Sequence, residues 1–471
     1  METNSVFQLL PTEIRPGIFK NLNRASLFNC LLVDRQWCRD IVPILWEEPL
    51  PLKKKGLPIA SNCLFLERQL LSADTVAKII DVYVSLFSKE FWQPLLKNEI
   101  SLPLTTRTPT FNYASYLKHY EPYAVSLAAG AWLKQKTIPL TDKQLQQRNA
   151  LTSALCKLFL TEAKSLISFY CYLNRDADIF SSISRGCQPS LIFNNLKELR
   201  IFGIQDGNEL QKFFENFTNI CHSIRGITFG RGPIFYSNNK IIEFSDDDKV
   251  KNAMMTQNEL EWLELYWLSA TAIRSIIRGL QSSSRTFRAI RFCRIDFNIF
   301  QPDSIIEGLS SCVNLDFHEC NAIEQKSWIE TGKYFTKLEC LMIEGHFQRT
   351  PITFIKQIIK TSGDNLQYLL IKETCLRAAS EGHTMLAEQL LPFILMYVKN
   401  LRTLSLGELK LEQLSSIHES CPKLENIDFY FKRLRNYWEP ISVPDYLRSK
   451  LKNYEIIKIH DVIGIYPKYF R

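Results

Sequence analysis

The stretch Leu260–Leu265, with the sequence LEWLEL, contains the pattern that decides the fold of this chain. Its last part, L-x-L, places Leu263 and Leu265 on the same side of a short strand, facing inward. The longer pattern L-x-x-L-x-L returns along the chain with apolar substitutes, and its L-x-L begins at positions 199, 227, 263, 290, 315, 341, 369, 404 and 427. A weaker first copy lies at Leu166–Phe169. A pattern repeated in this way predicts stacked structural repeats.

The steps between the copies are 28, 36, 27, 25, 26, 28, 35 and 23 residues, which leaves room for a helix after each strand. Each strand–helix unit leaves an apolar flank that the next unit must cover. We therefore expect an α/β solenoid with parallel strands inside and helices outside. The helices expected between the copies are Glu209–His222, Thr271–Leu280, Asp303–Ser310, Thr353–Thr361, Thr384–Val398 and Leu411–Ser420.

The copies resemble the leucine-rich-repeat family, in its cysteine-containing class, judged by Ser420–Leu424 (SCPKL) and by Ser311-Cys312 with Cys320. The resemblance implies a right-handed solenoid. Residues between and after the inward pair should then point to solvent on a concave face, where aromatic side chains and arginine suit protein recognition. These candidate substrate-binding residues are Arg200, Phe202, Glu264, Tyr266, Arg291, Asp316, His318, Glu344, Lys372, Asp428 and Tyr430.

The N-terminal stretch Leu9–Trp46 contains three short amphipathic patterns, with Asn23–Ser26 and Asp34 as helix-capping candidates. A unit below about 40 residues usually needs a disulfide, a metal or a partner to be stable. Neither a disulfide framework nor a metal spacing is present in this stretch. The apolar residues that recur on helical faces are Ile14, Ile18 and Leu22, then Leu27 and Leu31, then Val33, Trp37 and Ile41.

The order and spacing of these residues resemble an F-box. The resemblance implies docking on the Skp-family adaptor of a cullin-based ubiquitin ligase, with contacts at Leu10, Pro11, Ile14, Ile18, Leu27, Cys30, Val33 and Trp37. The sequence departs from the family at Pro16-Gly17, inside the expected first helix. Either the helix begins near Arg15 with Pro16 at its first position, or it is distorted.

We therefore expect three regions: an F-box-like module at 1–48, a linker and helical region at 49–160, and repeats with a C-terminal cap at 161–471. In the middle region we expect helices at Asp74–Phe87 and Gln144–Ala163, and a short helix at Phe111–His119. The 36-residue step contains Gly230–Met255, expected to be a loop that is either functional or a tolerated insertion. The strand-like Asn453–His460 would belong to the cap.

Composition narrows the partners and the compartment. The net charge of +8 is mild and spread out, so nucleic-acid binding is not expected. Thirteen cysteines without a C-x-x-C pair indicate reduced, buried thiols in a cytoplasmic or nuclear protein. The N-terminus does not have the pattern of a signal peptide. The longest apolar run, Leu390–Val398, is far shorter than the roughly 20 residues of a membrane helix, so no membrane partner is expected.

No motif of phosphate binding, zinc proteolysis or serine hydrolysis is present in the sequence. The His318-Glu319-Cys320 run is more typical of a surface histidine beside a buried cysteine than of a metal site. We therefore expect no catalysis, no metal and no cofactor, and a role as the substrate-recognition subunit of a Skp–cullin–F-box ligase. Two alternatives remain open: a repeat scaffold whose first fifty residues only cap the solenoid, and an enzyme with an unrecognised thiol.

Overall fold

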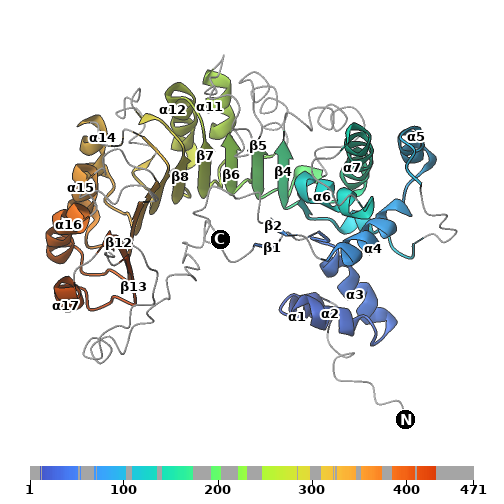
Figure 1. Ribbon diagram of the computed structural model, residues 1–471, viewed down its shortest axis with the longest axis horizontal. Coiled ribbons are helices and arrows are strands. Elements are labelled where there is room, and N and C mark those ends of the chain that lie inside the picture. Colours follow the sequence, from blue (N-terminus) through green and yellow to red (C-terminus); the bar gives the residue numbers. More distant parts are fainter. Residues whose placement is uncertain are drawn as a thin grey trace, which may run out of the picture. The chain divides into compact units, whose positions relative to one another are not determined.

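The structure of the chain is a computed structural model (Figure 1). It describes residues 11, 13–50, 53–54, 68–69, 72–101, 109–134, 141–172, 192–202, 221–230, 247–283, 285–297, 309–321, 323, 326–345, 352–373, 384–408 and 411–430. The fold is α/β, with eleven parallel strands in the sheet order β3 to β13, so that strands next to each other in the sequence are next to each other in the sheet. The chain forms two compact units, and among the described residues the first unit ends at Arg200 and the second begins at Ile201.

The first unit begins with a three-helix module, which consists of α1 (Ile14–Phe19), α2 (Arg24–Cys30) and α3 (Arg35–Leu45). Both expected caps are confirmed: Asn23 accepts a bond from the N–H of Ser26 at 2.9 Å, and Asp34 accepts one from the N–H of Trp37 at 2.7 Å. Helix α1 starts at Ile14, so Pro16 lies within its first turn. A proline there removes no intrahelical bond, because the first N–H groups of a helix have no helical partner.

The rest of the first unit is helical, with short strands. The helices are α4 (Ala73–Val84), α5 (Lys89–Lys97), the 3-10 helix η2 (Tyr113–Tyr116), α6 (Pro122–Trp132) and α7 (Asp142–Glu162). The strands are the antiparallel pair β1 (Lys53–Lys54) and β2 (Arg68–Gln69), then β3 (His119–Tyr120), β4 (Ser168–Tyr172) and β5 (Glu198–Phe202), which reaches across the unit boundary. The helices expected at 74–87 and 144–163 are confirmed. The short helix expected within 111–119 is instead a 3-10 turn followed by strand β3.

The second unit alternates strands and helices. Its strands are β6 (Gly226–Gly230), β7 (Trp262–Tyr266), β8 (Ala289–Cys293), β9 (Asn314–His318), β10 (Cys340–Gly345), β11 (Tyr368–Glu373), β12 (Thr403–Glu408) and β13 (Asn426–Tyr430). Its helices are α11 (Asp247–Met255), α12 (Ala270–Gly279), α14 (Lys326–Thr331), α15 (Ile352–Ser362), α16 (Thr384–Tyr397) and α17 (Leu411–Ser420), with 3-10 turns at Leu280–Ser283 and Gly332–Tyr334. Figure 1 shows these helices along one side of the strands.

The inward pair of each L-x-L forms the core of the second unit. Leu263 pairs in register with Ile290, which pairs with Leu315, and the ladder continues through Leu341 and Leu369. All five side chains are fully buried. The second apolar residue of each copy forms a parallel ladder that includes the stacked rings of residues 292 and 317. The nine strands predicted from the repeated pattern are therefore confirmed, as are the helices α12, α15, α16 and α17.

One backbone carbonyl per repeat accepts two N–H bonds from the next repeat. In the second unit, for example, the oxygen of Arg288 accepts bonds from Val313 and from the residue after it, at 2.7 and 2.9 Å. The same arrangement begins directly after α3, where the oxygen of Glu47 accepts bonds from Lys118 at 2.9 Å and His119 at 3.2 Å. The backbone after the three-helix module is therefore the first member of the repeated hydrogen-bond pattern.

The expected loop at 230–255 is partly wrong, because its last nine residues form helix α11. Val250 and Met254 are fully buried, and α11 packs against α12. Gly279 permits this approach, since a Cβ atom there would lie 2.5 Å from Met254 Cβ and 2.7 Å from the oxygen of Lys251. Four stretches lie outside the described residues: residues 231–246, most of the helix predicted at 209–222, most of the one predicted at 303–310, and the expected cap at 453–460.

Candidate functional site

The three-helix module has exposed apolar side chains although it also has a core of its own. Of the eleven large apolar side chains exposed in the described part of the chain, six lie between residues 14 and 33. The core of the module is formed by Phe19, Leu27, Ile41 and Leu45. The exposed residues, with their exposed fractions, are Ile14 (50%), Ile18 (37%), Leu22 (37%), Phe28 (65%), Leu32 (84%) and Val33 (58%). Clustered exposed apolar residues of this kind mark interaction surfaces.

Half of the predicted adaptor contacts are exposed. Pro11, Ile14, Ile18 and Val33 are exposed, as a contact residue must be. Cys30 and Trp37 are half-buried against the core of the module, and the Trp37 ring meets Phe19 edge-on at 5.2 Å. Leu27 is wrong as a contact residue, because it is 6% exposed and belongs to the core. Leu10 lies outside the described residues.

The prediction missed three exposed residues, Leu22, Phe28 and Leu32, as members of this surface. The spacing placed Leu22 on the same helical face as Ile14 and Ile18, but it was not named as a contact. For the other two a signal was available, since residues 27–33 read LFNCLLV, in which every residue except Asn29 is apolar. A short helix cannot bury apolar residues on every side without a partner.

Polar contacts fix the geometry of the module. The guanidinium of Arg15 and the carboxylate of Asp40 join α1 to α3 at 3.4 Å, with both side chains largely buried. Arg24 donates hydrogen bonds to the carbonyl oxygen of Leu45, the last residue of α3, and to those of Glu48 and Pro49 beyond it. Burial lowers the pKa of Arg24, while the nearby Glu48 opposes that effect. An ion pair and side-chain hydrogen bonds, in addition to apolar packing, therefore stabilise the module that presents the exposed apolar residues.

Aromatic packing continues from the module into the rest of the first unit. The ring of Trp46 lies 4.3 Å from that of Tyr113 and 5.2 Å from that of Tyr83. Tyr83 in turn meets Phe159 of α7 edge-on at 4.6 Å. Burial raises the pKa of Tyr83 well above its usual value. The module is thus packed into the first unit and not tethered to it by a loop.

The inner side of the strands in the second unit differs from the prediction. Glu264, Arg291, Asp316 and Glu344 were expected to point to solvent, but each is only 4–6% exposed. Phe202 is 8% exposed. An apolar cluster lies beside them on the same side of the strands, formed by Trp262, Ala289, Cys340, Met342 and Leu370, with Tyr368 packed against it. The expectation of a solvated recognition face is therefore wrong at these five positions.

Three buried charged residues and a buried threonine form an in-register row across four strands. Thr228 Oγ1 donates to Glu264 Oε2 at 3.0 Å, and Arg291 donates to Glu264 Oε1 at 2.6 Å and to Asp316 Oδ2 at 2.5 Å. Burial alone would lower the pKa of Arg291, but the two carboxylates outweigh it and hold that pKa well above its ordinary value. Asp316 Oδ1 is also buried, and no hydrogen bond reaches it from the described residues.

The next residues along the strands are less deeply buried. Tyr266 is partly buried, its ring lies 5.9 Å from that of Phe202, and burial raises its pKa well above the usual value. His318 lies beside Glu344, with Nδ1 3.8 Å from Oε2. In the first unit, the guanidinium of Arg200 lies over the ring of Tyr170 at 4.8 Å. Lys372, Asp428 and Tyr430 occupy positions on β11 and β13, but their side chains lie outside the described part of the chain.

The thiols favour a structural role. Of the ten cysteines described, eight are buried and two, Cys30 and Cys38, are half-buried. Burial raises the pKa of Cys221 and of Cys312 to about 12, and that of Cys421 to about 11. A thiol needs a lowered pKa to act as a nucleophile, so these groups are poor candidates for one. Within the same described residues, His, Cys, Asp and Glu side chains do not gather in the threes that a metal site needs.

Comparison with known proteins adds no relative to this picture. No family model matches the chain, and no curated protein matches its sequence. Among the helices that the structure describes, none has both the length and the apolar character required to cross a membrane. The functional argument therefore depends on the surfaces described above.

Proposed function

We propose that the three-helix module is an F-box that docks on a Skp-family adaptor, and that the repeats form a right-handed leucine-rich-repeat solenoid of the cysteine-containing class. In this proposal the chain is the substrate-recognition subunit of a Skp–cullin–F-box type ubiquitin ligase. The adaptor would join it to a cullin, and other subunits would transfer ubiquitin. The repeats would hold a protein substrate near the site of transfer, which raises the effective concentration of the two reactants.

One observation carries the proposal: large apolar residues remain exposed on a module whose core is already filled. Ile14, Phe28 and Val33 are each at least half exposed, while Phe19, Leu27 and Ile41 close the core beneath them. Burying an apolar side chain contributes roughly 1.5–3 kcal/mol. Six such residues supply enough apolar area for a partner helix or groove, and four of them, Ile14, Ile18, Leu22 and Val33, belong to the pattern that resembles an F-box.

The packing of the module supports the same function. Trp46 is held between aromatic rings of the first unit, and the oxygen of Glu47 starts the hydrogen-bond pattern of the repeats. A ligase subunit must hold its substrate at a defined position relative to the adaptor. A module joined by packing and backbone hydrogen bonds meets that need better than one on a flexible linker.

The test is co-expression of the full chain with a Skp-family adaptor, followed by size-exclusion chromatography. The double variant Ile14→Asp/Val33→Asp places charge on the exposed surface and leaves the core of the module intact. We expect the wild type to co-elute with the adaptor and the double variant to elute alone with an unchanged melting temperature. The matched control is Met396→Asp on α16, an apolar residue that is 63% exposed and far along the sequence.

Two outcomes would overturn the proposal. A folded wild-type chain that elutes without the adaptor would favour the repeat scaffold without a ligase role. Equal loss of co-elution in Met396→Asp would show that added charge, and not the N-terminal surface, causes the effect. Because contact residues at interface centres often account for 2 kcal/mol or more each, the double variant should weaken binding by at least about a hundredfold.

A further inference from the structure

Two rows of side chains on the inner side of strands β7 to β11 are buried. The first residues of the five strands form one row and the third residues form the next, each in register. With the exception of Tyr368, which is half-buried, every member of both rows is at most 7% exposed. The members are Trp262, Ala289, Asn314, Cys340 and Tyr368 in the first row, and Glu264, Arg291, Asp316, Met342 and Leu370 in the second.

Neighbouring strands alone do not bury side chains at these positions to this extent. Arg200 on β5 and Arg291 on β8 both stand between the two residues of an inward pair, and both strands have a neighbour on each side. The side chain of Arg200 is 24% exposed, while that of Arg291 is 5% exposed. The inner side at β8 is therefore covered by something in addition to the neighbouring strands.

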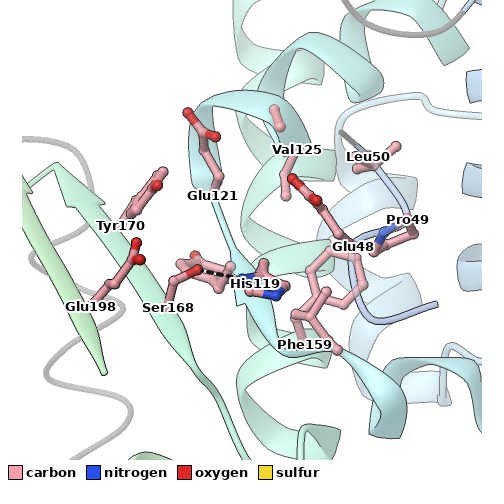
Figure 2. Close-up of a pocket in the computed structure, with 13 residues that line it drawn as sticks. Glu48, Pro49, Leu50, His119, Glu121, Val125, Phe159, Ser168, Tyr170 and Glu198 are labelled. Atoms are coloured by element: carbon pink, nitrogen blue, oxygen red, sulfur yellow. Dashed lines mark hydrogen bonds between the residues drawn. The ribbon is translucent and has the colours of Figure 1, made fainter. Parts of the chain in front are cut away.

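The inner side of the strands is open in the first unit. A cavity of about 160 Å³ lies there, and its lining includes Glu48, His119, Ser168 and Glu198. Glu198 directly precedes the fully buried Leu199, so strand alternation places it on the inner side. Figure 2 shows Glu198 at the cavity beside the hydrogen bond of 2.8 Å between His119 Nδ1 and Ser168 Oγ. The Glu198 side chain is 41% exposed, as expected of an inner side without a cover.

The cover over β7 to β11 comes from outside the described residues. Figure 1 shows the described helices of this unit along the other side of the strands. Among the described residues, the apolar cluster on the inner side consists of strand residues alone, and its large members Trp262 and Met342 are 7% and 6% exposed. Because the structure contains a single chain, a stretch of this same chain must supply the cover.

The position of the cluster narrows the choice of stretch. Trp262, Ala289 and Cys340 are the first residues of their strands. The stretches outside the described residues that follow β6, β8, β10 and β11 begin near the opposite ends of the strands, and each must lead on to the next helix or strand. Residues 431–471 follow β13 directly and are connected to the described chain at one end only. This segment is therefore the one that can extend across several strands.

The segment 431–471 has sufficient length and a suitable composition. Adjacent strands lie about 4.8 Å apart and an extended chain advances about 3.3 Å per residue, so roughly ten residues span the distance from β13 to β7. The segment contains eight aromatic residues, and nine lysines and arginines against four aspartates and glutamates. Its aromatic side chains suit the apolar cluster. Its basic side chains suit Asp316, whose buried Oδ1 accepts no hydrogen bond from the described residues.

We propose that the segment 431–471 turns back from β13 and covers the inner side of β7 to β11, with apolar side chains against Trp262 and Met342 and a hydrogen-bond donor beside Asp316. The inner side of the second unit is then an occupied surface, and a protein that binds there must displace the segment or contact it. This role goes beyond capping the open end of the repeats. It does not depend on the proposed adaptor docking, because the exposed apolar surface belongs to the first unit.

The first test is photo-cross-linking of the full chain. The variant Tyr368→p-benzoylphenylalanine places a photoreactive ring at the half-buried edge of the apolar cluster. After irradiation and digestion, we expect mass spectrometry to find this position linked to peptides from 431–471. The matched control is Tyr334→p-benzoylphenylalanine on the 3-10 turn before β10, where the side chain is 42% exposed. The control should give no link to these peptides.

Three results of the cross-linking would overturn the proposal. Links from position 368 to neighbouring strands alone would show that the inner side has no cover. Links to another stretch, such as 51–67, would assign the cover to that stretch. Equal yields of links to 431–471 from positions 334 and 368 would show that the segment has no preferred place.

Limited trypsin digestion of the full chain tests the same contact from the side of the segment. Met342→Asp places a carboxylate in the covered row, and the matched control Met396→Asp places one on α16, where the side chain is 63% exposed. Cleavage within 431–471 should be slow in the wild type and in the control. It should be at least about tenfold faster in Met342→Asp, because an unpaired carboxylate opposes burial by the segment. Circular dichroism verifies that the repeats remain folded, and equal cleavage of the segment in all three proteins would overturn the proposal.

Discussion

The three-helix module and the inner side of the second unit differ in which side chains they expose: the module exposes apolar side chains, and the second unit buries charged ones. In the module, apolar side chains such as Phe28 and Leu32 stand in solvent at 65% and 84% exposure. On the strands of the second unit, Arg291 and Asp316 are buried at 4% exposure. Residue type alone predicts the reverse arrangement. Exposed apolar residues and buried charges each need an explanation, and the explanations differ: the first indicates a partner, the second a structural network.

The most direct test of this difference is to remove the cation, Arg291, from the buried row. Arg291→Met leaves Glu264 and Asp316 buried on the two strands that flank position 291, without a cation between them. Breaking a buried ion pair by removing one partner costs about 3–5 kcal/mol, so the free energy of unfolding should fall by that amount. Urea denaturation of the full chain, followed by circular dichroism, measures the change.

The matched control is Arg225→Met. Arg225 also pairs with carboxylates of neighbouring residues, Glu259 at 3.5 Å and Glu261 at 3.7 Å, but its side chain is 53% exposed. An exposed pair contributes at most about 1 kcal/mol. Equal losses in the two variants would show that the inner row of the second unit is solvated and available to a substrate, as the sequence suggested.

The second test compares neighbours on one helix of the module. Leu27 is 6% exposed and Phe28 is 65% exposed, although both belong to α2. Leu27→Ala should lower the free energy of unfolding by about 2–4 kcal/mol, because it opens a cavity in a small core. Phe28→Ala should change it by less than about 0.5 kcal/mol. Thermal and urea unfolding of both variants give the values.

The effect of Phe28→Ala on adaptor binding should be large although its effect on stability is small. Phe28→Ala should weaken co-elution with a Skp-family adaptor while the protein stays fully folded. A folded Phe28→Ala chain that binds as the wild type does would remove Phe28 from the proposed surface. A large loss of stability in Phe28→Ala would contradict its exposure.

The strands and several helices could be predicted because their signal is local. Each L-x-L needs only alternation over three residues, and every copy lies on a strand from β5 to β13. Asn23 and Asp34 were recognised as caps because a cap acts within three residues. Helix α14 was missed because its six residues are too short for a clear period. Helix α11 was not predicted because the interval that contains it, residues 230–255, is rich in turn residues.

The sites could not be predicted because they depend on contacts that are distant in sequence. Burial of Glu264 and Asp316 follows from their pairing with Arg291, 27 and 25 residues away. The cavity of the first unit joins Glu48 and Glu198 with residues between them in the chain. Strand alternation predicts on which face of the sheet a side chain lies, but it does not predict whether that face is exposed to solvent. Only part of the exposed surface of the module was predicted. The F-box resemblance indicated which residues could be contacts, but it did not indicate which of them are exposed.

The smallest expected effect on stability is that of His318, which lies at the edge of the buried row. Burial lowers the pKa of His318 below its ordinary value, and this effect outweighs the nearby carboxylates, which would raise it. The imidazole is therefore neutral in the folded chain at pH values where it is protonated in the unfolded chain. The charged groups around it are Asp316, Glu319, Arg291, Arg294 and Glu344.

Because the unfolded chain binds this proton more readily, the contribution of His318 to stability is fully present above the unfolded pKa of about 6.5 and is lost as pH falls from there through the folded pKa. In His318→Gln the free energy of unfolding should fall less steeply between pH 7.5 and 5.5 than in the wild type. The exposed His222→Gln is the control and should follow the wild-type slope. Urea denaturation at several pH values measures the three slopes. If His318→Gln also follows the wild type, the edge of the row is open to water, and the contrast between the two regions is confined to Glu264, Arg291 and Asp316.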